Sequence, residues 1–304
     1  MTDGSAPRLT SPRKVIWPAV GATKADLWRY LESVARRMLP QVSGRPLSLL
    51  RCPNGVEAEG FLQKNLPEAA PGWLPRHAQW TPTSRRTVAY ALAEKADDLR
   101  WMANQAAVEL HEMLVRADRD DRPDLLVFDL DPGEQGPRAP QAAHWLREVL
   151  DELGLEAAIK TSGKRGLHLV VPIQRRYEFF QARAFGLAAA RACADRHPDA
   201  LTVAMRKADR NGRLLLDWSR NGAAQTMVAP WSPRATPTAT VSMPLRWDEV
   251  ADNLDPSAFT IASALRRPDP WEHLPPAKRL ERATAFLERA GYELADASPR
   301  SRVR

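Results

Sequence analysis

Two aspartates, two residues apart, stand at the end of an apolar run in the middle of the chain. The run LLVFDLD carries Asp129 and Asp131, and the dipeptide PG follows it directly. Because side chains alternate along a strand, both carboxylates share one face while the apolar residues between them point to the other. Neighbouring carboxylates repel each other unless a positive charge neutralises them, and a divalent cation does so. The pattern predicts a metal-binding pair, with two solvated acids at a strand end as the simpler alternative.

A third acid, Asp217, lies in a similar apolar run, RLLLDWS. A carboxylate inside an apolar strand needs a partner. Asp217 either joins the first two acids at a shared ion or pairs with a cationic side chain. Basic residues surround it in the sequence: Arg206, Lys207, Arg210, Arg213 and Arg220. Taken alone, this segment favours the ion pair.

Between these two runs, the segment KTSGKRGLHLVVP contains a glycine-rich turn that carries the charges of Lys160, Lys164 and Arg165. We expect its backbone N–H groups and the hydroxyl of Ser162 to bind phosphate. It is not a P-loop, because the order Gly-x-x-x-x-Gly-Lys-Ser/Thr is absent. An ordinary hairpin turn with solvated cations is the alternative. His168, which follows the turn, fits a packed strand residue as well as a ligand.

Three acids and a basic turn together suggest two-metal phosphoryl or nucleotidyl transfer. In that chemistry one ion activates an attacking oxygen, the other holds the triphosphate, and cationic side chains balance the remaining charge. The pair His111-Glu112 suggests a zinc protease, but the second histidine of His-Glu-x-x-His is missing, which excludes that site.

The segments that must position these residues are a mixture of helices and strands. Thr23 and Asp26 form a capping-box pattern before apolar residues at helical spacing, which predicts a helix that starts near Thr23. Further helices are expected over residues 99–113, 140–153, 178–195 and 277–290, and strands over residues 125–131, 166–173 and 213–219. Interleaved helices and strands predict an α+β protein. Parallel and antiparallel pairing of the strands both remain open.

Length and composition fit a folded protein. The 304 residues are 44% hydrophobic and 27% charged, with ten tryptophans, which argues against global disorder. No apolar run approaches the roughly 18 residues of a membrane span, and the polar start is not a signal peptide, so we expect a cytoplasmic protein. Two distant cysteines argue against a disulfide scaffold or zinc site. The net charge of +7 fits a polyanionic partner and a merely solubilising surface equally well.

The motifs, in this order, resemble the polymerase domain of bacterial DNA ligase D, a member of the archaeo-eukaryotic primase superfamily used in non-homologous end joining. The resemblance runs from about residue 9 to at least residue 255. It rests on the segments LTSPRKVIWP, GRPLSLLRCPNG, EGFLQKN, ANQAAVELH, LLVFDLDPG, TSGKRGLHLVVP, GRLLLDWSRN and VAPWSPRA. It implies a primase-like catalytic fold with central mixed β-sheets surrounded by helices.

The same resemblance implies one primase-polymerase unit over residues 9–295. Its expected portions are a DNA-end and template-binding part over residues 9–120, a catalytic core over residues 121–250, and a helical part over residues 251–295. The ends, residues 1–8 and 296–304, are expected to be disordered. The ligase and 3′-processing modules of the family are not found in this chain, and no Lys-x-Asp-Gly motif occurs. We therefore expect either a stand-alone polymerase or a piece of a longer protein.

The resemblance also implies roles for individual residues. Asp129, Asp131 and Asp217 match the catalytic acids that hold two divalent ions, manganese or magnesium. The residues expected to bind the nucleotide are His111, Ser162, Arg165, Arg210 and Arg234. Lys14 and Lys24 match a pair that binds a DNA 5′-phosphate, and Lys24 also falls at a predicted helix N-terminus, where phosphate binds well. The residues expected at the template strand are Arg51, Phe61 and Lys64.

Two positions depart from the family pattern. Arg165 stands where lysine is usual, so a planar fork replaces a point charge. Leu62 stands where many relatives carry a second phenylalanine, which predicts weaker stacking on the template.

The function implied is a template-dependent nucleotidyltransferase that adds nucleotides, preferring ribonucleotides, to DNA 3′ ends and gaps during double-strand break repair. Its expected partners are DNA with a 5′-phosphate at an end or gap, nucleoside triphosphates, a separate DNA ligase and an end-binding protein, and its expected location is the bacterial nucleoid. Two alternatives remain. A non-catalytic end-binding module would lack one of the metal acids, and a metal-dependent nuclease would not need a triphosphate-binding turn.

Overall fold

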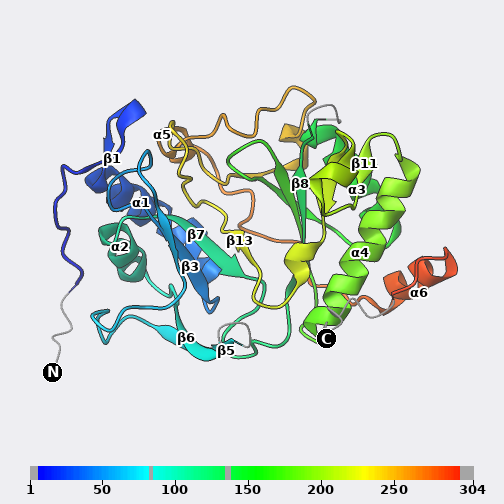
Figure 1. The fold of residues 1–304 in the computed structure, drawn as a ribbon, viewed down its shortest axis with the longest axis horizontal. Helices are drawn as coiled ribbons and strands as arrows, with labels where there is room; N and C mark the ends of the chain where they lie inside the picture. The colour runs from blue at the N-terminus through cyan, green and yellow to red at the C-terminus, as the bar shows by residue number, and fades with distance from the viewer. Residues whose placement is uncertain (1–5, 82–84, 134–137, 295–304) are drawn as a thin grey trace.

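The structure, a computed structural model, describes residues 6–81, 85–133 and 138–294. Within these residues the strands form two large six-stranded sheets and one two-stranded sheet. Figure 1 shows α1 and α2 beside one large sheet and α4 beside the other. The predicted α+β class is confirmed. Of the ends expected to be disordered, residues 1–5 and 296–304 lie outside the described residues.

The first large sheet carries the three acids. Its strands, in spatial order, are β11 (Leu201–Thr202), β12 (Leu214–Asp217), β8 (Leu125–Asp131), β10 (Leu167–Pro172), β9 (Ala158–Thr161) and β14 (Pro244–Leu245). The three strands predicted from the sequence are β8, β10 and β12, and their bounds differ from the predicted ones by at most two residues. The pairing that the sequence left open is antiparallel, because β8 runs antiparallel to both β10 and β12.

Two helices cover one face of this sheet. They are α3 (Ala139–Glu152) and α4 (Phe179–Arg196), which agree with the helices predicted over residues 140–153 and 178–195. Leu126, Phe128 and Leu130 of β8 are fully buried in the core cluster that includes residues of both helices. Strand alternation then leaves Asp129 and Asp131 on the opposite face, as predicted.

The second large sheet lies on the other side of the acids. Its strands, in spatial order, are β13 (Thr226–Val228), β7 (Ala107–Met113), β3 (Leu47–Arg51), β6 (Arg86–Ala91) and β5 (Arg76–Thr81), and β4 (Phe61–Gln63) also pairs with β3. Helices α1 (Lys24–Val42) and α2 (Ala96–Asn104) pack against each other, and α2 contacts β7. Because β13 comes from the chain after the three acids, the second sheet combines both halves of the molecule. The predicted division into portions stays a prediction.

Helix α1 begins where the sequence predicts. The Thr23 hydroxyl accepts the N–H of Asp26, and the Asp26 carboxylate accepts the N–H of Thr23 at 2.8 Å. This reciprocal capping box satisfies two of the N–H groups that a helix N-terminus leaves unpaired.

The helix predicted over residues 99–113 is confirmed as far as Asn104 and is wrong beyond it. Helix α2 ends at Asn104, Ala106 has a left-handed φ of 53°, and residues 107–113 form strand β7. Since β7 lies between β3 and β13, nearly all of its residues are buried, and polar-apolar alternation is limited to residues 108–111, because Glu112 interrupts it. A strand buried on both faces cannot be told from a buried helix by periodicity alone.

The remaining elements are short. They are β1 (Val15–Trp17), β2 (Ala22–Thr23), α5 (Ile261–Ala264), α6 (Glu281–Arg289) and the 3₁₀ helices η1 (Pro18–Val20), η2 (Lys207–Arg210), η3 (Ser219–Asn221) and η4 (Trp247–Glu249). The helix predicted over residues 277–290 begins later than expected, because Lys278 forms a parallel β-bridge with Ile173. No helix within the described residues is long and apolar enough to span a membrane.

Candidate active site

The three acids gather on one face of the first sheet. Across the antiparallel pairs, Asp129 of β8 lies directly opposite Asp217 of β12 on one side and His168 of β10 on the other. Residues paired in this way point to the same face. These three side chains, together with that of Asp131, line a cleft of about 550 Å³. The fold therefore brings the predicted catalytic acids together.

Arginine side chains neutralise these carboxylates. Nε of Arg220 lies 3.2 Å from Oδ2 of Asp217 and 3.6 Å from Oδ2 of Asp129. Arg210 Nη1 donates to Oδ2 of Asp131 at 3.0 Å. The two sequence interpretations of Asp217 are thus compatible, since this acid pairs with an arginine and also stands beside Asp129.

The cluster fits a divalent cation in its chemistry. Within the part of the chain that the structure describes, no group of three or more His, Cys, Asp and Glu side chains is arranged to hold a metal ion. However, one positive group, Arg220, already contacts carboxylate oxygens of both Asp129 and Asp217, so the two oxygens converge on a common point. Three carboxylates offer the all-oxygen ligands that magnesium and manganese prefer. Metal binding at this cluster remains a proposal.

His168 is a site residue whose role the sequence left open. It is buried, and its Nε2 lies 3.3 Å from Oδ1 of Asp129. Burial, reinforced by the charge of Lys160, lowers the pKa of His168 to about 4. Burial alone would raise the pKa of Asp129, but His168, Arg220 and Lys160 outweigh it and lower that pKa. Asp129 is therefore a carboxylate at neutral pH.

Lys160 does not present its charge on the turn, as the sequence suggested. It is fully buried, and its Nζ lies 2.7 Å from Nδ1 of His168, 2.9 Å from the carbonyl oxygen of Val228 and 2.7 Å from Oγ of Ser242. Burial lowers the pKa of Lys160 to about 7. Because β9 belongs to the first sheet and Val228 to the second, this one side chain connects the two sheets beneath the cleft.

The turn after β9 uses its serine differently from the prediction. Oγ of Ser162 accepts the N–H groups of Lys164 at 3.2 Å and of Gly166 at 3.1 Å, so these two amides pair inside the turn. Gly163 has a φ of 71°, in the left-handed region that glycine adopts readily. The exposed side chains of Lys164 and Arg165 line the cleft and remain the groups available to an anion.

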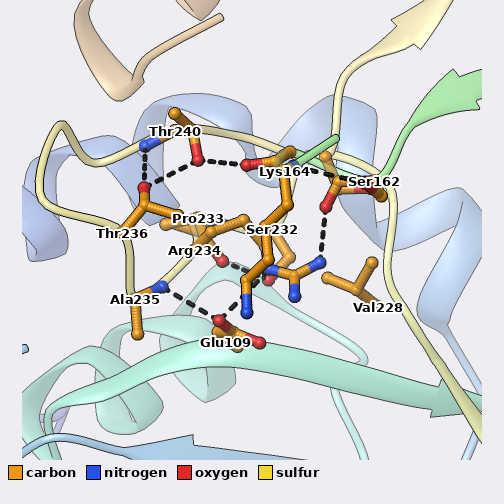
Figure 2. Close-up of polar contacts among 12 residues, drawn as sticks. Glu109, Ser162, Lys164, Val228, Ser232, Pro233, Arg234, Ala235, Thr236 and Thr240 are labelled. Carbon is orange, nitrogen blue, oxygen red and sulfur yellow. Dashed lines mark hydrogen bonds and ion pairs between the residues drawn. The ribbon is translucent and has the colours of Figure 1, made fainter. Parts of the chain in front are cut away.

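A buried carboxylate that the sequence did not indicate, Glu109, connects two of the predicted nucleotide-binding residues. Its Oε2 lies 2.8 Å from Nε2 of His111, and its Oε1 lies 3.1 Å from Nε of Arg234. Figure 2 shows Glu109 below Arg234, whose guanidinium extends toward Ser162 and donates to its carbonyl oxygen. The only sequence signal was the spacing of Glu109 and His111, which puts both on one face of a strand.

All eight residues predicted as metal- or nucleotide-binding line this single cleft. They are His111, Asp129, Asp131, Ser162, Arg165, Arg210, Asp217 and Arg234. Acids from the first sheet thus face cations from the turn, from η2 and from the loop after β13. A charge distribution of this kind can hold a polyphosphate close to a group that is to be activated.

Lys14 and Lys24 form a second cationic cluster outside this cleft. The backbone N–H of Lys24 donates to the carbonyl oxygen of Lys14 at 2.8 Å. Lys24 is the first residue of α1, it is largely buried, and its Nζ donates to Oγ1 of Thr10 at 3.2 Å. Burial, together with the charges of Lys14 and Arg51, lowers the pKa of Lys24. Cations that repel one another at a helix N-terminus favour an anionic ligand.

The predicted template residues lie near this second cluster. Arg51 pairs with Phe61 across β3 and β4, and its guanidinium carbon lies 5.2 Å from the centre of the Phe61 ring. Phe61 and Leu62 are each 48% exposed, which is unusual for large apolar side chains, and Lys64 is exposed beside them. An exposed ring next to cations is a surface on which a nucleic acid base can stack.

Comparisons with known proteins agree with this geometry. The family model described as "LigD, primase-polymerase domain" matches residues 23–273. The chain is 39% identical over 249 residues to the multifunctional non-homologous end joining protein LigD of Mycolicibacterium smegmatis, covering 81% of this chain and 32% of that protein. It is 30% identical to the bifunctional LigD of Bacillus subtilis, covering 86% of this chain and 42% of that protein. The chain thus spans between about a third and two fifths of the length of these relatives.

A solved structure is similar over nearly its whole length. It is the polymerase domain of Mycobacterium tuberculosis ligase D in complex with DNA, which matches with a TM-score of 0.80 and 34% sequence identity. The match covers 85% of this chain and 93% of that one.

Proposed function

The chain belongs to the LigD primase-polymerase family, and from this premise we propose that it is a template-dependent polymerase that extends DNA 3′ ends and fills gaps during non-homologous end joining. The observation that carries the proposal is the cleft in which three carboxylates face a cationic turn. A non-catalytic end-binding module has no need of that arrangement.

The proposed reaction joins a DNA 3′ end to a nucleoside triphosphate. The 3′-OH loses its proton to solvent, its oxygen attacks the α-phosphorus to form the new P–O bond, and the bond to the leaving pyrophosphate breaks. Two divalent ions, manganese or magnesium, would supply the positive charge that lowers the pKa of the 3′-OH and neutralises the pyrophosphate. Asp129, Asp131 and Asp217 would hold these ions.

The remaining cleft residues would bind and orient the nucleotide. Arg165 and Lys164 extend from the turn, and Arg234 extends from the facing loop, so their charges can surround a triphosphate. Arg210 and Arg220, which pair with the acids, would exchange a carboxylate for a phosphate oxygen when nucleotide and ions bind. Ser219 fixes Asp217 in place, because its N–H and hydroxyl both donate to Oδ1 at 2.8 and 2.6 Å.

Binding to broken DNA is the second part of the proposal. Lys14 and Lys24 would contact a 5′-phosphate on the far side of a gap, while Phe61, with Arg51 and Lys64, would contact the template strand. The similar structure is a complex with DNA, which supports a DNA substrate. Ribonucleotide preference, a separate ligase and an end-binding partner are also part of what we propose.

Primer extension on a gapped duplex with a 5′-phosphate, with labelled ribo- and deoxyribonucleotides in parallel, tests the function. We expect templated addition, faster with ribonucleotides. Shortening of the primer would instead identify a nuclease, and binding without any change in primer length would identify an end-binding module.

A further inference from the structure

Glu109 lies at the centre of β7, is only 2% exposed, and has no role in the chemistry proposed above. Its carboxylate has three partners. Besides His111 at 2.8 Å and Arg234 at 3.1 Å, it accepts the backbone N–H of Ala235 at 2.9 Å. Figure 2 shows this arrangement, with Ala235 and Arg234 both directed at the carboxylate from above the strand.

The carboxylate is ionised at neutral pH. Burial alone would raise the pKa of Glu109, but the hydrogen bond from His111, the charge of Arg234 and the Ala235 amide outweigh it and lower that pKa to about 2. In a buried environment such charge-assisted contacts are stronger and more directional than on the surface.

Glu109 joins two parts of the cleft that belong to different elements. His111 comes from β7 in the second sheet, whereas Arg234 comes from the loop after β13. That loop in turn contacts the turn after β9, because Arg234 donates to the carbonyl oxygen of Ser162 and Thr240 donates to that of Gly163. One carboxylate therefore sets the position of His111 relative to the cationic turn.

Arg234 also keeps a free donor for a ligand. Its Nη1 donates to the carbonyl oxygen of Ser162 and its Nε forms an ion pair with Oε1 of Glu109 at 3.1 Å without a hydrogen bond, while Nη2 has neither kind of contact among the described residues. Because one hydrogen bond and one ion pair hold the planar guanidinium, Nη2 has a defined direction, and Arg234 lines the cleft. A pre-oriented guanidinium loses less conformational entropy when it binds an anion.

We propose that Glu109 is a positioning residue for the nucleotide: without touching the ligand, it fixes Arg234 and His111 in the orientation that binds a nucleoside triphosphate. This inference rests on the proposed function, because it assigns the nucleotide to this cleft. It predicts that Glu109 governs nucleotide affinity and leaves DNA affinity alone.

The variant Glu109→Gln tests this role. Glutamine keeps the size and an acceptor for the Ala235 N–H, but removes the charge that His111 and Arg234 share. We expect the KM for nucleotide, and the Kd from direct titration with a nucleoside triphosphate, to rise about ten- to hundredfold. The kcat at saturating nucleotide should change by less than about threefold, and DNA affinity should not change.

The chain offers a matched control in Glu112→Gln. Glu112 is also 2% exposed and lies on the same strand, but three residues further on, so it faces the opposite side of the sheet. The Glu112→Gln variant should have a KM for nucleotide within about twofold of the wild-type value. Equal effects of the two variants on KM would show a general loss of β7 packing and overturn the proposal. If Glu109→Gln does not fold, Glu109→Asp carries the same test, because its shorter side chain cannot reach both partners.

A double-mutant cycle separates positioning from an independent effect. If Glu109 acts in part through His111, Glu109→Gln should raise the KM less in a His111→Ala background than in wild type. Full additivity would overturn the positioning role. Titration of the wild-type protein with a nucleoside triphosphate distinguishes the two proposals. If wild type does not bind the nucleotide, the proposed function is contradicted. If wild type and Glu109→Gln both bind it tightly, only the role of Glu109 is contradicted.

Discussion

Asp129 has an aspartate beside it on one neighbouring strand and a histidine beside it on the other. These neighbours determine how single substitutions should change the charge of the cluster. Asp217 faces it from β12 and His168 from β10. Arg220 contacts both carboxylates, so charge balance at the cluster depends on all three groups. Removing one carboxylate would remove one of the proposed metal ligands and leave the packing beneath it in place.

We expect Asp217→Asn to abolish primer extension while DNA binding persists. Asparagine keeps the acceptor for the N–H and hydroxyl of Ser219, so the local backbone should hold, but it loses the negative charge. Extension assays in magnesium and in manganese measure this. The matched control is Asp151→Asn, which removes an exposed carboxylate of α3 that pairs with Arg147. Substantial extension by Asp217→Asn with either ion would contradict the assignment of this acid.

Glu112 provides a pH-dependent prediction at the residue scale. It is buried, its Oε2 has no hydrogen-bond partner among the described residues, and Arg45 Nε lies 3.6 Å away. Burial raises the pKa of Glu112 from 4.5 to about 7. Between these values the folded state binds more protons than the unfolded state, so the contribution of Glu112 to stability is present below the lower value and is lost as the pH rises through the upper one.

Glu112→Gln should therefore gain stability relative to wild type as the pH rises. Between about pH 5 and about pH 8, the difference in free energy of unfolding should move in favour of the variant by on the order of 3 kcal/mol. Urea unfolding of both proteins at the two pH values measures it. A difference that stays constant with pH would mean that Glu112 titrates in its ordinary range.

At the scale of elements, the sequence predicted what local pattern controls. Strands β8, β10 and β12 were predicted because each apolar run is bounded by turn residues, and α1 because its capping box is local. Strand β7 was not predicted, because its alternation covers only residues 108–111 and its burial on both faces resembles that of a buried helix. Glu109 was missed for a different reason: its partner Ala235 is 126 residues away, so only the tertiary fold brings the two together.

The cationic turn offers an element-scale prediction through its glycine. Gly163 has a φ of 71°, and a Cβ there would lie 2.6 Å from Cγ of Arg234 and 2.9 Å from the backbone of Val241. Gly163→Ala should therefore displace Arg234 as well as strain the turn. We expect stability to fall by more than about 1 kcal/mol and nucleotide affinity to fall with it.

Gly154→Ala is the control for that substitution. Gly154 has nearly the same φ, 72°, but a Cβ there would meet no atom within 4 Å. The Gly154→Ala variant should lose stability through backbone strain alone, and its nucleotide affinity should stay unchanged. Thermal unfolding measures the stability of both variants, and nucleotide titration measures their affinity for the nucleotide. If the two variants bind nucleotide equally well, the contact between the turn and Arg234 does not matter for binding.

At the scale of the whole molecule, whose net charge is +7, cationic side chains gather at two separate places among the described residues. One is the cleft, where cations face acids. The other comprises Lys14, Lys24 and Arg51. Burial lowers the pKa of Lys24, and repulsion by the positive charges of Lys14 and Arg51 lowers it further. A phosphate bound there would relieve that repulsion, and it would lie on the N-terminal side of the molecule, apart from the acids of the first sheet.

The double variant Lys14→Gln, Lys24→Gln tests this division. Glutamine keeps most of each side-chain stem, which matters because Lys24 is largely buried. A terminal phosphate carries nearly two charges at pH 7, so wild type should bind a phosphorylated gap more tightly than an unphosphorylated one. The variant should bind both with the same affinity, and its affinity should depend less steeply on salt, because fewer counterions are released.

The control for this experiment removes the same charge elsewhere. Lys278→Gln, Arg279→Gln changes two cations just before α6, which contact Glu156 and Gln174. If net charge alone governs DNA binding, both double variants should weaken it equally, and the preference for the 5′-phosphate should survive in each. If Lys14 and Lys24 recognise the phosphate, only their variant should lose the preference, while extension of a plain primer–template should continue because the acids are untouched. Indifference of wild type itself to the phosphate would reduce these lysines to general surface charge.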